Sequence, residues 1–118
     1  MDFAGDDVAE LLILYPGAQR ADAGGRPYFL LPDMALPDGC TPESTDALLC
    51  PRERDGYSSR LFLARQIAHR GSGTNWNAMN VRILERNWFA VSWRVQASLR
   101  LVQLIRGHLD AFREKRNA

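Results

Sequence analysis

The chain has 118 residues, of which 46% are hydrophobic and 25% are charged, and its formal net charge is +1. This length and composition are typical of one globular domain with one core, so we expect residues 1–118 to form a single domain. Because acidic and basic residues nearly balance, there is no general attraction to phosphate backbones or anionic lipids, and neither nucleic acid nor a membrane is an expected partner.

The composition also restricts location and cofactor chemistry. No apolar run approaches the roughly 20 residues that span a bilayer, and residues 1–7 lack the basic and then apolar order of a signal peptide. We therefore expect a cytoplasmic protein. Cys40 and Cys50 are too few for a disulfide framework and lie far in sequence from both histidines, so no metal site is predicted. No organic cofactor is implied.

The N-terminal segment has the pattern of a short helix, which Asp6 and Asp7 can cap at its start. Pro16 and Gly17 stop the pattern. Residues 11–14 also fit a buried strand, which leaves that alternative open. Apolar side chains recur here at helical spacing: Val8, Leu11, Leu12 and Tyr15.

Four strand-like runs follow, and turn residues separate them. The sequence Ala-Gly-Gly-Arg at 23–26 is typical of a hairpin turn between the first two runs. A loop rich in proline and glycine precedes the third run, and a polar link with a likely turn at Asp55-Gly56 precedes the fourth. This order predicts a four-stranded antiparallel meander. The runs are 18–22, 27–31, 47–50 and 61–67.

All three tryptophans lie in the stretch 75–95, where Asn80 follows Trp76 by four residues and Ser92 follows Trp88 by four. Packed aromatic rings hold their neighbours in place, so a polar atom among them is either a hydrogen-bonded core group or a group held for chemistry. We interpret this stretch as a site loop. Residues 69–75 contain two glycines and should form a flexible connection into it.

The last predicted element is a long helix from Gln96 to about Arg113, in which Gly107 is the first residue to weaken the pattern. Polar residues occupy one face, and an apolar stripe on the other should pack across the sheet. The fold class is therefore α+β. The stripe consists of Leu99, Val102, Ile105, Leu109 and Phe112.

A set of short motifs accompanies these elements along nearly the whole chain: Tyr15-Pro16-Gly17-Ala18, Tyr28-Phe29-Leu30-Leu31-Pro32, Leu48-Leu49-Cys50-Pro51, Gly56-Tyr57, Arg60-Leu61-Phe62-Leu63, Asn75-Trp76, Ile83-Leu84 with Arg86 and Trp88, Ser92-Trp93, and Ile105 with His108-Leu109. In this order the chain resembles the bacterial ubiquitin-conjugating-enzyme-like (UBC-like) family of ubiquitin-like conjugation operons. The resemblance implies a reduced UBC fold, namely an N-terminal helix, a four-stranded meander, a site loop and a long C-terminal helix.

The resemblance also implies an activity, that of an acyl transferase of the conjugating-enzyme type. Such a protein takes the C-terminal carboxyl of a ubiquitin-like modifier from an adenylating activating enzyme and passes it to an amine of a target protein. The usual carrier is a cysteine thiolate, which attacks well and leaves easily. No cysteine lies between the fourth strand and the last helix, so a thioester at the usual position is excluded.

Ser92 is the substitute that the resemblance favours, because the element from Trp88 to Ser92 is similar to a Trp-x-x-x-Ser element of the bacterial family. It would carry the modifier as an oxyester, and its hydroxyl would need a general base, for which His69 and His108 are candidates. Candidate donors to the oxyanion are Asn80, Asn87 and Arg94. Residues expected to line the modifier-binding pocket are Trp76, Trp88, Trp93 and Arg94.

Other interpretations remain open. If Asn80 occupies the position of the conventional nucleophile, an amide cannot act there, and the protein is a noncatalytic variant that binds the modifier, the activating enzyme or a catalytic partner. Ser92 also fits a turn residue bonded to backbone, and the tryptophans also fit ordinary core positions. A small β-rich binding domain of unrelated fold is a third possibility.

Overall fold

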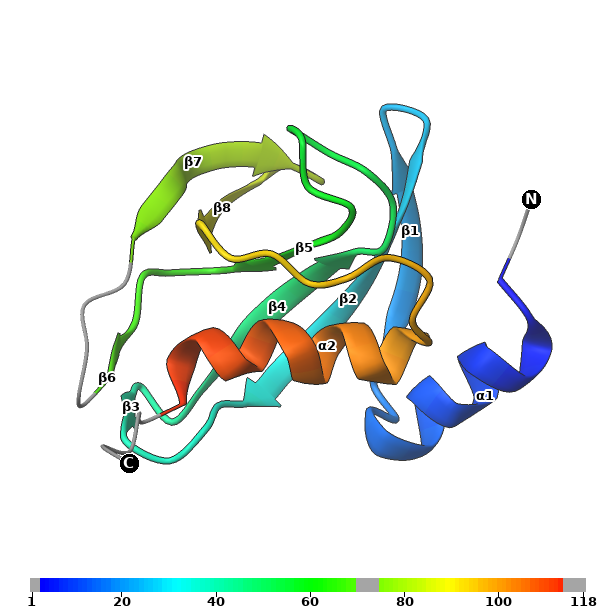
Figure 1. The fold of residues 1–118 in the computed structure, drawn as a ribbon, viewed down its shortest axis with the longest axis horizontal. Helices are drawn as coiled ribbons and strands as arrows, with labels where there is room; N and C mark the ends of the chain where they lie inside the picture. Colours follow the sequence, from blue (N-terminus) through cyan, green and yellow to red (C-terminus); the bar gives the residue numbers. More distant parts are fainter. Residues whose placement is uncertain (1–2, 70–74, 114–118) are drawn as a thin grey trace.

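The computed structural model describes residues 3–69 and 75–113, and the predicted flexible connection at 70–74 falls outside them. The α+β class is confirmed, since an antiparallel sheet packs with two helices (Figure 1). The main sheet has six strands in the order β1-β2-β4-β5-β8-β7, and β3 pairs with β6 in a separate ribbon. The elements are α1 (Gly5–Leu14), β1 (Gln19–Ala23), β2 (Arg26–Ala35), β3 (Cys40–Thr41), β4 (Ser44–Cys50), β5 (Arg60–Leu63), β6 (Ala68–His69), β7 (Trp76–Ile83), β8 (Arg86–Val91), α2 (Leu101–Leu109) and the 3₁₀ turn η1 (Asp110–Phe112).

The first predicted turn has the conformation that its residues favour. Gly24 and Gly25 have φ values of 57° and 80° and join β1 to β2, with Ala23 opposite Arg26. Positive φ at both central residues is what a tight hairpin needs, and glycine adopts it without steric cost. The helix predicted at the N-terminus is also present, as α1.

The stretch 75–95 is not a loop but mainly a β-hairpin, which adds two strands to the predicted four. Strands β7 and β8 pair around a turn at Leu84 and Glu85, whose φ values are 53° and 63°. Strand β8 then joins β5, where Leu63 lies opposite Phe89. Leucine and glutamate seldom adopt positive φ, so their residue types did not indicate a turn at this point.

Strand β7 forms one free edge of the sheet and is irregular. Its pairing with β8 shifts register between Trp76 and Ala78 and again between Ala78 and Val81. Asn80, in the second shift, has a φ of 55°, which asparagine tolerates better than most residues. The edge strand is therefore bulged and bent rather than straight.

The C-terminal helix is shorter than predicted, because α2 begins at Leu101 and not at Gln96. Residues 92–100, which we call the strap, connect β8 to α2 and include Ser98 with a φ of 68°. The first helical N–H, that of Leu101, donates to Oδ1 of Asp7 at 2.8 Å. An acidic residue of α1 therefore caps α2.

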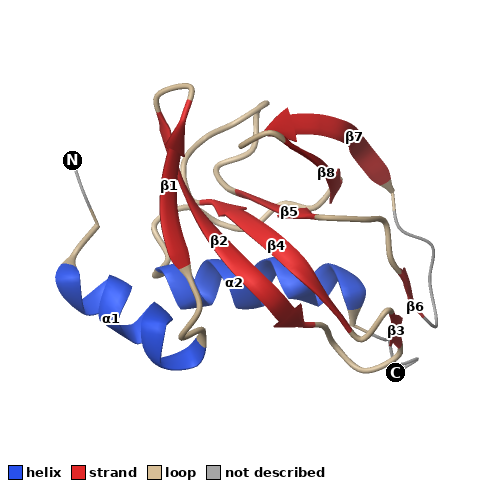
Figure 2. Cartoon of the chain, turned by 180° about the vertical axis from the view of Figure 1, so that it is seen from behind, coloured by secondary structure: helices blue, strands red, loops and turns tan. Residues whose placement is uncertain are grey.

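The alternation of side chains along the strands fills a core on each face of the sheet. Phe29 and Leu49 belong to the larger cluster, which includes the buried face of α2. Their neighbours Tyr28 and Leu48 belong to a second cluster with Trp88. Figure 2 shows that α2 runs across one face of the sheet, with the strands in front of it. Within the described residues, neither helix is long and apolar enough to cross a membrane.

Candidate functional site

Ser92 follows the last residue of β8 and is exposed. Its backbone N–H donates to the carbonyl of Asn75 at 2.7 Å, which continues the β7–β8 pairing by one bond and fixes the position of the residue. Its hydroxyl lies 3.0 Å from the phenol oxygen of Tyr57. Ser92 is thus an exposed residue whose hydroxyl is held in place, and both properties suit a carrier group.

A tight turn places Tyr57 beside Ser92. Arg54 and Tyr57 exchange two backbone hydrogen bonds, at 2.9 and 3.0 Å. Asp55 and Gly56 between them have φ values of 56° and 86°, so the turn predicted from Asp-Gly is confirmed. Because this turn is short and closed, the tyrosine ring has a defined position at the end of the sheet.

Two further side chains continue the hydrogen-bond network into the interior. The amide nitrogen of Asn77 donates to the phenol oxygen of Tyr57 at 2.7 Å. Nη2 of Arg60 donates to Oδ1 of Asn77 at 2.6 Å and to the carbonyl of Val91 at 3.1 Å. Since arginine only donates, this contact requires the Asn77 oxygen to face Arg60 and the amide nitrogen to face Tyr57.

Positive charge surrounds the phenol. The guanidinium carbons of Arg60 and Arg94 lie 4.2 and 4.5 Å from the centroid of the Tyr57 ring. Arg94 also donates to the carbonyl of Gly56 at 2.9 Å. The hydrogen bond with Ser92 lowers the pKa of Tyr57, and Asn77 and the two arginines lower it further, against the opposing effect of burial. The phenol is thus easier to ionise than an ordinary tyrosine.

The structure brings Ser92 and Arg94 together around Tyr57, but it places both histidines elsewhere. His69 lies on β6, with its ring edge-on to Phe112 at 5.9 Å, and neither of its ring nitrogens has a hydrogen-bond partner among the described residues. His108 lies in α2, and its Nε2 is 2.8 Å from Oγ of Ser59. Neither histidine is hydrogen-bonded to Ser92, so the geometry does not support either as its base.

The three tryptophans support the fold around the site. Trp88 is fully buried, and its Nε1 donates to the carbonyl of Ile83 at 2.9 Å, so it cannot line a surface pocket. Trp93 is half-buried and ties the strap to α2 through a bond from Nε1 to the carbonyl of Gly107 at 2.9 Å. Trp76 is half-buried against Phe112, with 6.0 Å between ring centroids.

The remaining predicted residues lie apart from the network. Asn80 is exposed in the bulge of β7, and Asn87 is exposed on β8 opposite Arg82. No described hydrogen bond joins either amide to Ser92 or Tyr57. Cys40 and Cys50 are buried free thiols, and burial raises the pKa of each, which disfavours the nucleophilic thiolate.

Sequence reasoning missed Tyr57, Asn77 and Arg60 as members of the site. Gly56-Tyr57 and Arg60 stand out in the sequence only as parts of family-like motifs. A usable signal was present, because the Asp55-Gly56 turn places the next residue at the end of a strand connection, where functional side chains are common. An arginine that begins an otherwise apolar strand is a second signal, since a buried arginine requires partners.

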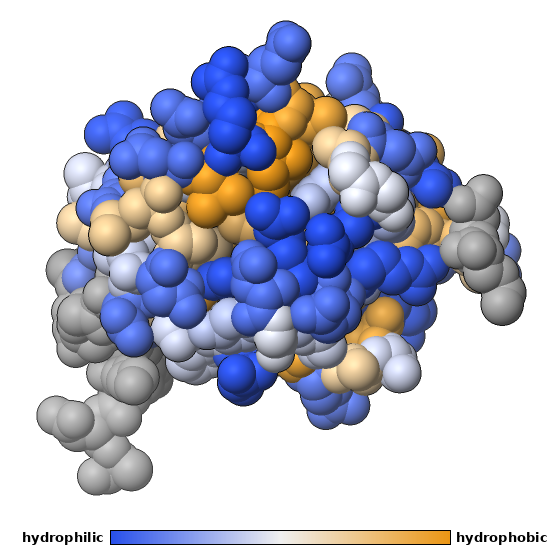
Figure 3. Space-filling view, turned by 90° about the horizontal axis from the view of Figure 1, so that it is seen from above, coloured by the Kyte–Doolittle hydropathy of each residue, from blue (hydrophilic) through white to orange (hydrophobic). Residues whose placement is uncertain are grey.

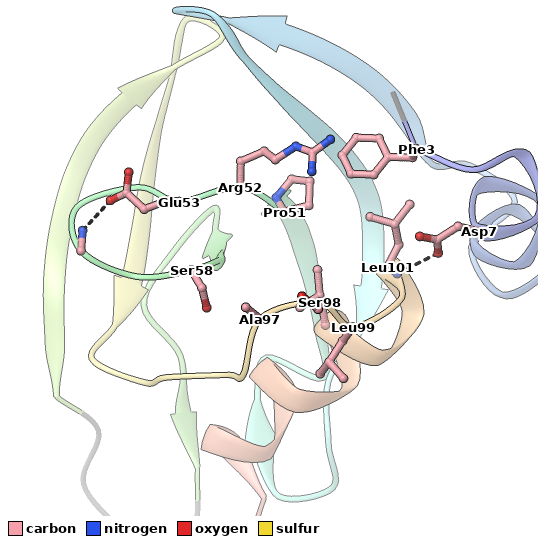
Figure 4. A pocket seen from close by; sticks show the side chains of 12 residues that line it. Phe3, Asp7, Pro51, Arg52, Glu53, Ser58, Ala97, Ser98, Leu99 and Leu101 are labelled. Carbon is pink, nitrogen blue, oxygen red and sulfur yellow. Dashed lines mark hydrogen bonds between the residues drawn. The ribbon is translucent and has the colours of Figure 1, made fainter. Parts of the chain in front are cut away.

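A hollow of about 680 Å³ opens beside this network (Figure 4). It lies between the link that follows β4 and the strap, and Gly56, Ser58 and Ser98 are among its lining residues. At its far end the guanidinium carbon of Arg52 lies 4.4 Å from the centroid of the Phe3 ring. Figure 3 shows the molecule from above, where hydrophilic side chains surround a smaller apolar area. An extended polar chain could lie in such a hollow.

The side chains around Ser92 limit which chemistry the site can support. An exposed hydroxyl, an adjacent ionisable phenol and two guanidinium groups are suited to acyl transfer through an oxygen nucleophile. Among the described residues, no group of three or more His, Cys, Asp or Glu side chains could hold a metal ion. The chain matches no family model, and no curated protein or solved structure is significantly similar to it.

Proposed function

We propose that the protein is a UBC-like component of a ubiquitin-like conjugation pathway, in which Ser92 carries the C-terminal carboxyl of the modifier as an oxyester. The observation that supports this proposal best is the exposed Ser92 hydroxyl, held 3.0 Å from the Tyr57 phenol and within a network that also contains Arg94. A serine kept only for packing needs no cationic and ionisable neighbours.

The surroundings of Ser92 fit the needs of an oxyester carrier. The tetrahedral intermediate of acyl transfer develops negative charge on the former carbonyl oxygen, and an adjacent cation stabilises that charge. Arg94 follows Ser92 by two residues and is exposed, and the hydrogen bond from its guanidinium to the Gly56 carbonyl orients it. An extended peptide tail in the hollow along the strap would lie against Gly56 and Ser58, which flank Tyr57, the hydrogen-bond partner of Ser92.

The pathway would then have two steps. An adenylating enzyme supplies the activated carboxyl, and the Ser92 oxygen takes it up. An amine of the target protein next attacks the oxyester and releases the hydroxyl. An oxyester is less reactive than a thioester, so the second step depends on a positioned amine, which is consistent with a partner protein that presents the target.

The test is an adduct assay with ATP, a ubiquitin-like protein and its adenylating enzyme from the same genome. We expect an adduct that survives reducing agent, is cleaved by hydroxylamine or mild alkali, and is missing in Ser92→Ala. Thr41→Ala is the control, because it removes an exposed hydroxyl on β3 that does not line the hollow. An adduct that persists in Ser92→Ala would show that another residue carries the modifier.

A noncatalytic UBC-like subunit is the second candidate. It is favoured by three consecutive apolar side chains that α1 leaves exposed, Leu12, Ile13 and Leu14, of which Ile13 is 77% exposed. Such a surface is common where a protein partner binds. A stable complex with the modifier or the activating enzyme, with no covalent species under any condition, would favour this candidate over the carrier.

A further inference from the structure

We propose that the phenol of Tyr57, as its phenolate, is the general base that removes the hydroxyl proton of Ser92, and that the resulting neutral phenol later returns a proton to the same oxygen. This inference rests on the proposed role of Ser92 as the acyl carrier and names the group that makes its oxygen nucleophilic. Tyr57 is then a catalytic residue, because its oxygen touches the reacting oxygen.

The phenol oxygen of Tyr57 has two hydrogen-bond partners, the Asn77 amide and the Ser92 hydroxyl. Arg60 fixes the orientation of the Asn77 amide, so the amide donates one hydrogen bond to Tyr57. The second contact of the phenol oxygen is with the Ser92 hydroxyl, which can donate or accept. As a neutral phenol, Tyr57 donates to Ser92. As a phenolate, it accepts from both Asn77 and Ser92. Both protonation states are satisfied without moving a side chain.

The charged groups around the ring favour the phenolate. Arg60 approaches it from β5 and Arg94 from the strap, with their guanidinium carbons 4.2 and 4.5 Å from the ring centroid. Two carboxylates belong to the same link: that of Asp55 is paired with Arg54 at 3.4 Å and with Arg60 at 3.9 Å, and that of Glu53 accepts the N–H of Gly56 at 2.9 Å. Both carboxylates are therefore engaged by other groups, and the hydrogen bonds of Ser92 and Asn77 together with the two arginines lower the pKa of Tyr57.

No other described titratable side chain is hydrogen-bonded to Ser92. His108 is 5% exposed and shares its bond with Ser59 instead. His69 belongs to the ribbon of β3 and β6, where it contacts Phe112. A base must lie within hydrogen-bond reach of the proton that it removes, and Tyr57 meets this condition.

The chemistry balances with an activated ester or thioester as the acyl donor. The Ser92 oxygen forms a bond to the carbonyl carbon while its proton moves to the Tyr57 oxygen. The bond from carbon to the leaving group breaks, and the leaving thiolate or alkoxide keeps the electron pair. When an amine later attacks the oxyester, the carbon–oxygen bond to Ser92 breaks, Tyr57 gives its proton to the departing oxygen, and the amine loses a proton to water.

The inference can be tested without the modifier. p-Nitrophenyl acetate is an activated ester, and acetylation of the intact protein can be followed by mass spectrometry and assigned to Ser92 by peptide mapping. We expect Tyr57→Phe to slow acetylation of Ser92 about 100-fold near neutral pH, as loss of a general base typically does. The acetylation rate of wild-type Ser92 should rise with pH as Tyr57 ionises, and Tyr57→Phe should lack this rise. Tyr28→Phe is the matched control, since Tyr28 is another buried tyrosine bonded to an arginine, Arg54.

A second measurement tests the ionisation of Tyr57 without any acyl-transfer reaction. Ultraviolet difference spectra of the wild-type protein during alkaline titration should show one phenol that ionises below the ordinary range, and Tyr57→Phe should lack it. An unchanged acetylation rate in Tyr57→Phe, the same low-pH ionisation in that variant, or no acetylation of Ser92 in the wild type would overturn the inference. If Tyr57-dependent acetylation occurs but no modifier adduct forms, the conjugation proposal fails and the role of Tyr57 stands.

Discussion

Oγ of Ser59 lies 2.8 Å from Nε2 of His108, and both side chains are buried, with exposed fractions of 2% and 5%. The bond joins the residue before β5 to α2. Burial, with a smaller effect from the charge of Arg60, lowers the pKa of His108 to about 4. The imidazole is therefore neutral at physiological pH, and the folded protein resists its protonation.

Because of His108, we expect the protein to lose stability in mild acid. The unfolded chain binds a proton at His108 near its ordinary pKa of 6.5, whereas the folded chain binds one only near 4. Between these two values the unfolded state holds more protons, so the free energy of unfolding falls as pH falls, by about 3 kcal/mol in total. Urea unfolding followed by circular dichroism over this pH range measures the effect.

His108→Gln should flatten this pH dependence, because glutamine can still bond to Ser59 but does not titrate. His69→Gln is the control and should keep the dependence, since His108 remains in that variant. If both variants keep the same slope as the wild type, another group is responsible for the acid sensitivity.

Gly107→Ala should destabilise the protein although alanine favours helices. A Cβ at position 107 would lie 2.9 Å from Cγ1 of Val95, closer than real contacts allow. Overpacking should cost about 1–3 kcal/mol against a gain of about 1 kcal/mol in helix propensity, so we expect a net loss of up to about 2 kcal/mol. Thermal unfolding measures the change. Gly5→Ala in α1, where a Cβ meets nothing within 4 Å, is the matched control.

A double variant identifies the cause of that loss. With Val95→Ala in place, the contact with position 107 disappears, and Gly107→Ala should become neutral or stabilising. An equal loss in both backgrounds would mean that the strap does not press on α2 at this point.

Asp7→Ala should lower the free energy of unfolding by about 1 kcal/mol. The Asp7 carboxylate accepts the N–H of Leu101, and loss of a side-chain cap typically costs this amount. The neighbouring Asp6→Ala is the control, because Asp6 is exposed and its carboxylate accepts no hydrogen bond in the described part of the chain. Equal losses in the two variants would indicate a general charge effect at the start of α1.

Trp88→Phe should destabilise the protein by about 2 kcal/mol, because it removes buried volume and leaves the Ile83 carbonyl without its donor. Trp76→Phe should cost less, since Trp76 is only half-buried. Chemical unfolding followed by far-ultraviolet circular dichroism distinguishes them. A larger loss in Trp76→Phe would contradict the assignment of Trp88 to the centre of the second core.

The fold was predictable where local chemistry decides conformation. Gly24-Gly25 and Asp55-Gly56 form the turns that their residue types favour, and α1 follows its apolar spacing. The hairpin of β7 and β8 was missed because its turn uses Leu84 and Glu85, whose strained backbone is maintained by packing of the flanking strands.

The start of α2 and the composition of the site depend on contacts between distant parts of the chain. The cap on Leu101 comes from Asp7, so local periodicity over 96–113 could not place the first turn. Ser92 and Arg94 could be named from the sequence, but Tyr57 could not be paired with Ser92, since 35 residues separate them. Hydrogen-bond partners of this kind become visible only when the strands are assembled.

The bulged edge strand β7 has a consequence for the protein at high concentration. A straight free edge offers an unbroken row of backbone donors and acceptors to which another copy can add a strand. The two register shifts around Ala78 and the left-handed conformation of Asn80 interrupt that row and turn it aside. At high concentration, copies of the chain that meet along β7 should therefore not pair strand to strand and form fibrils.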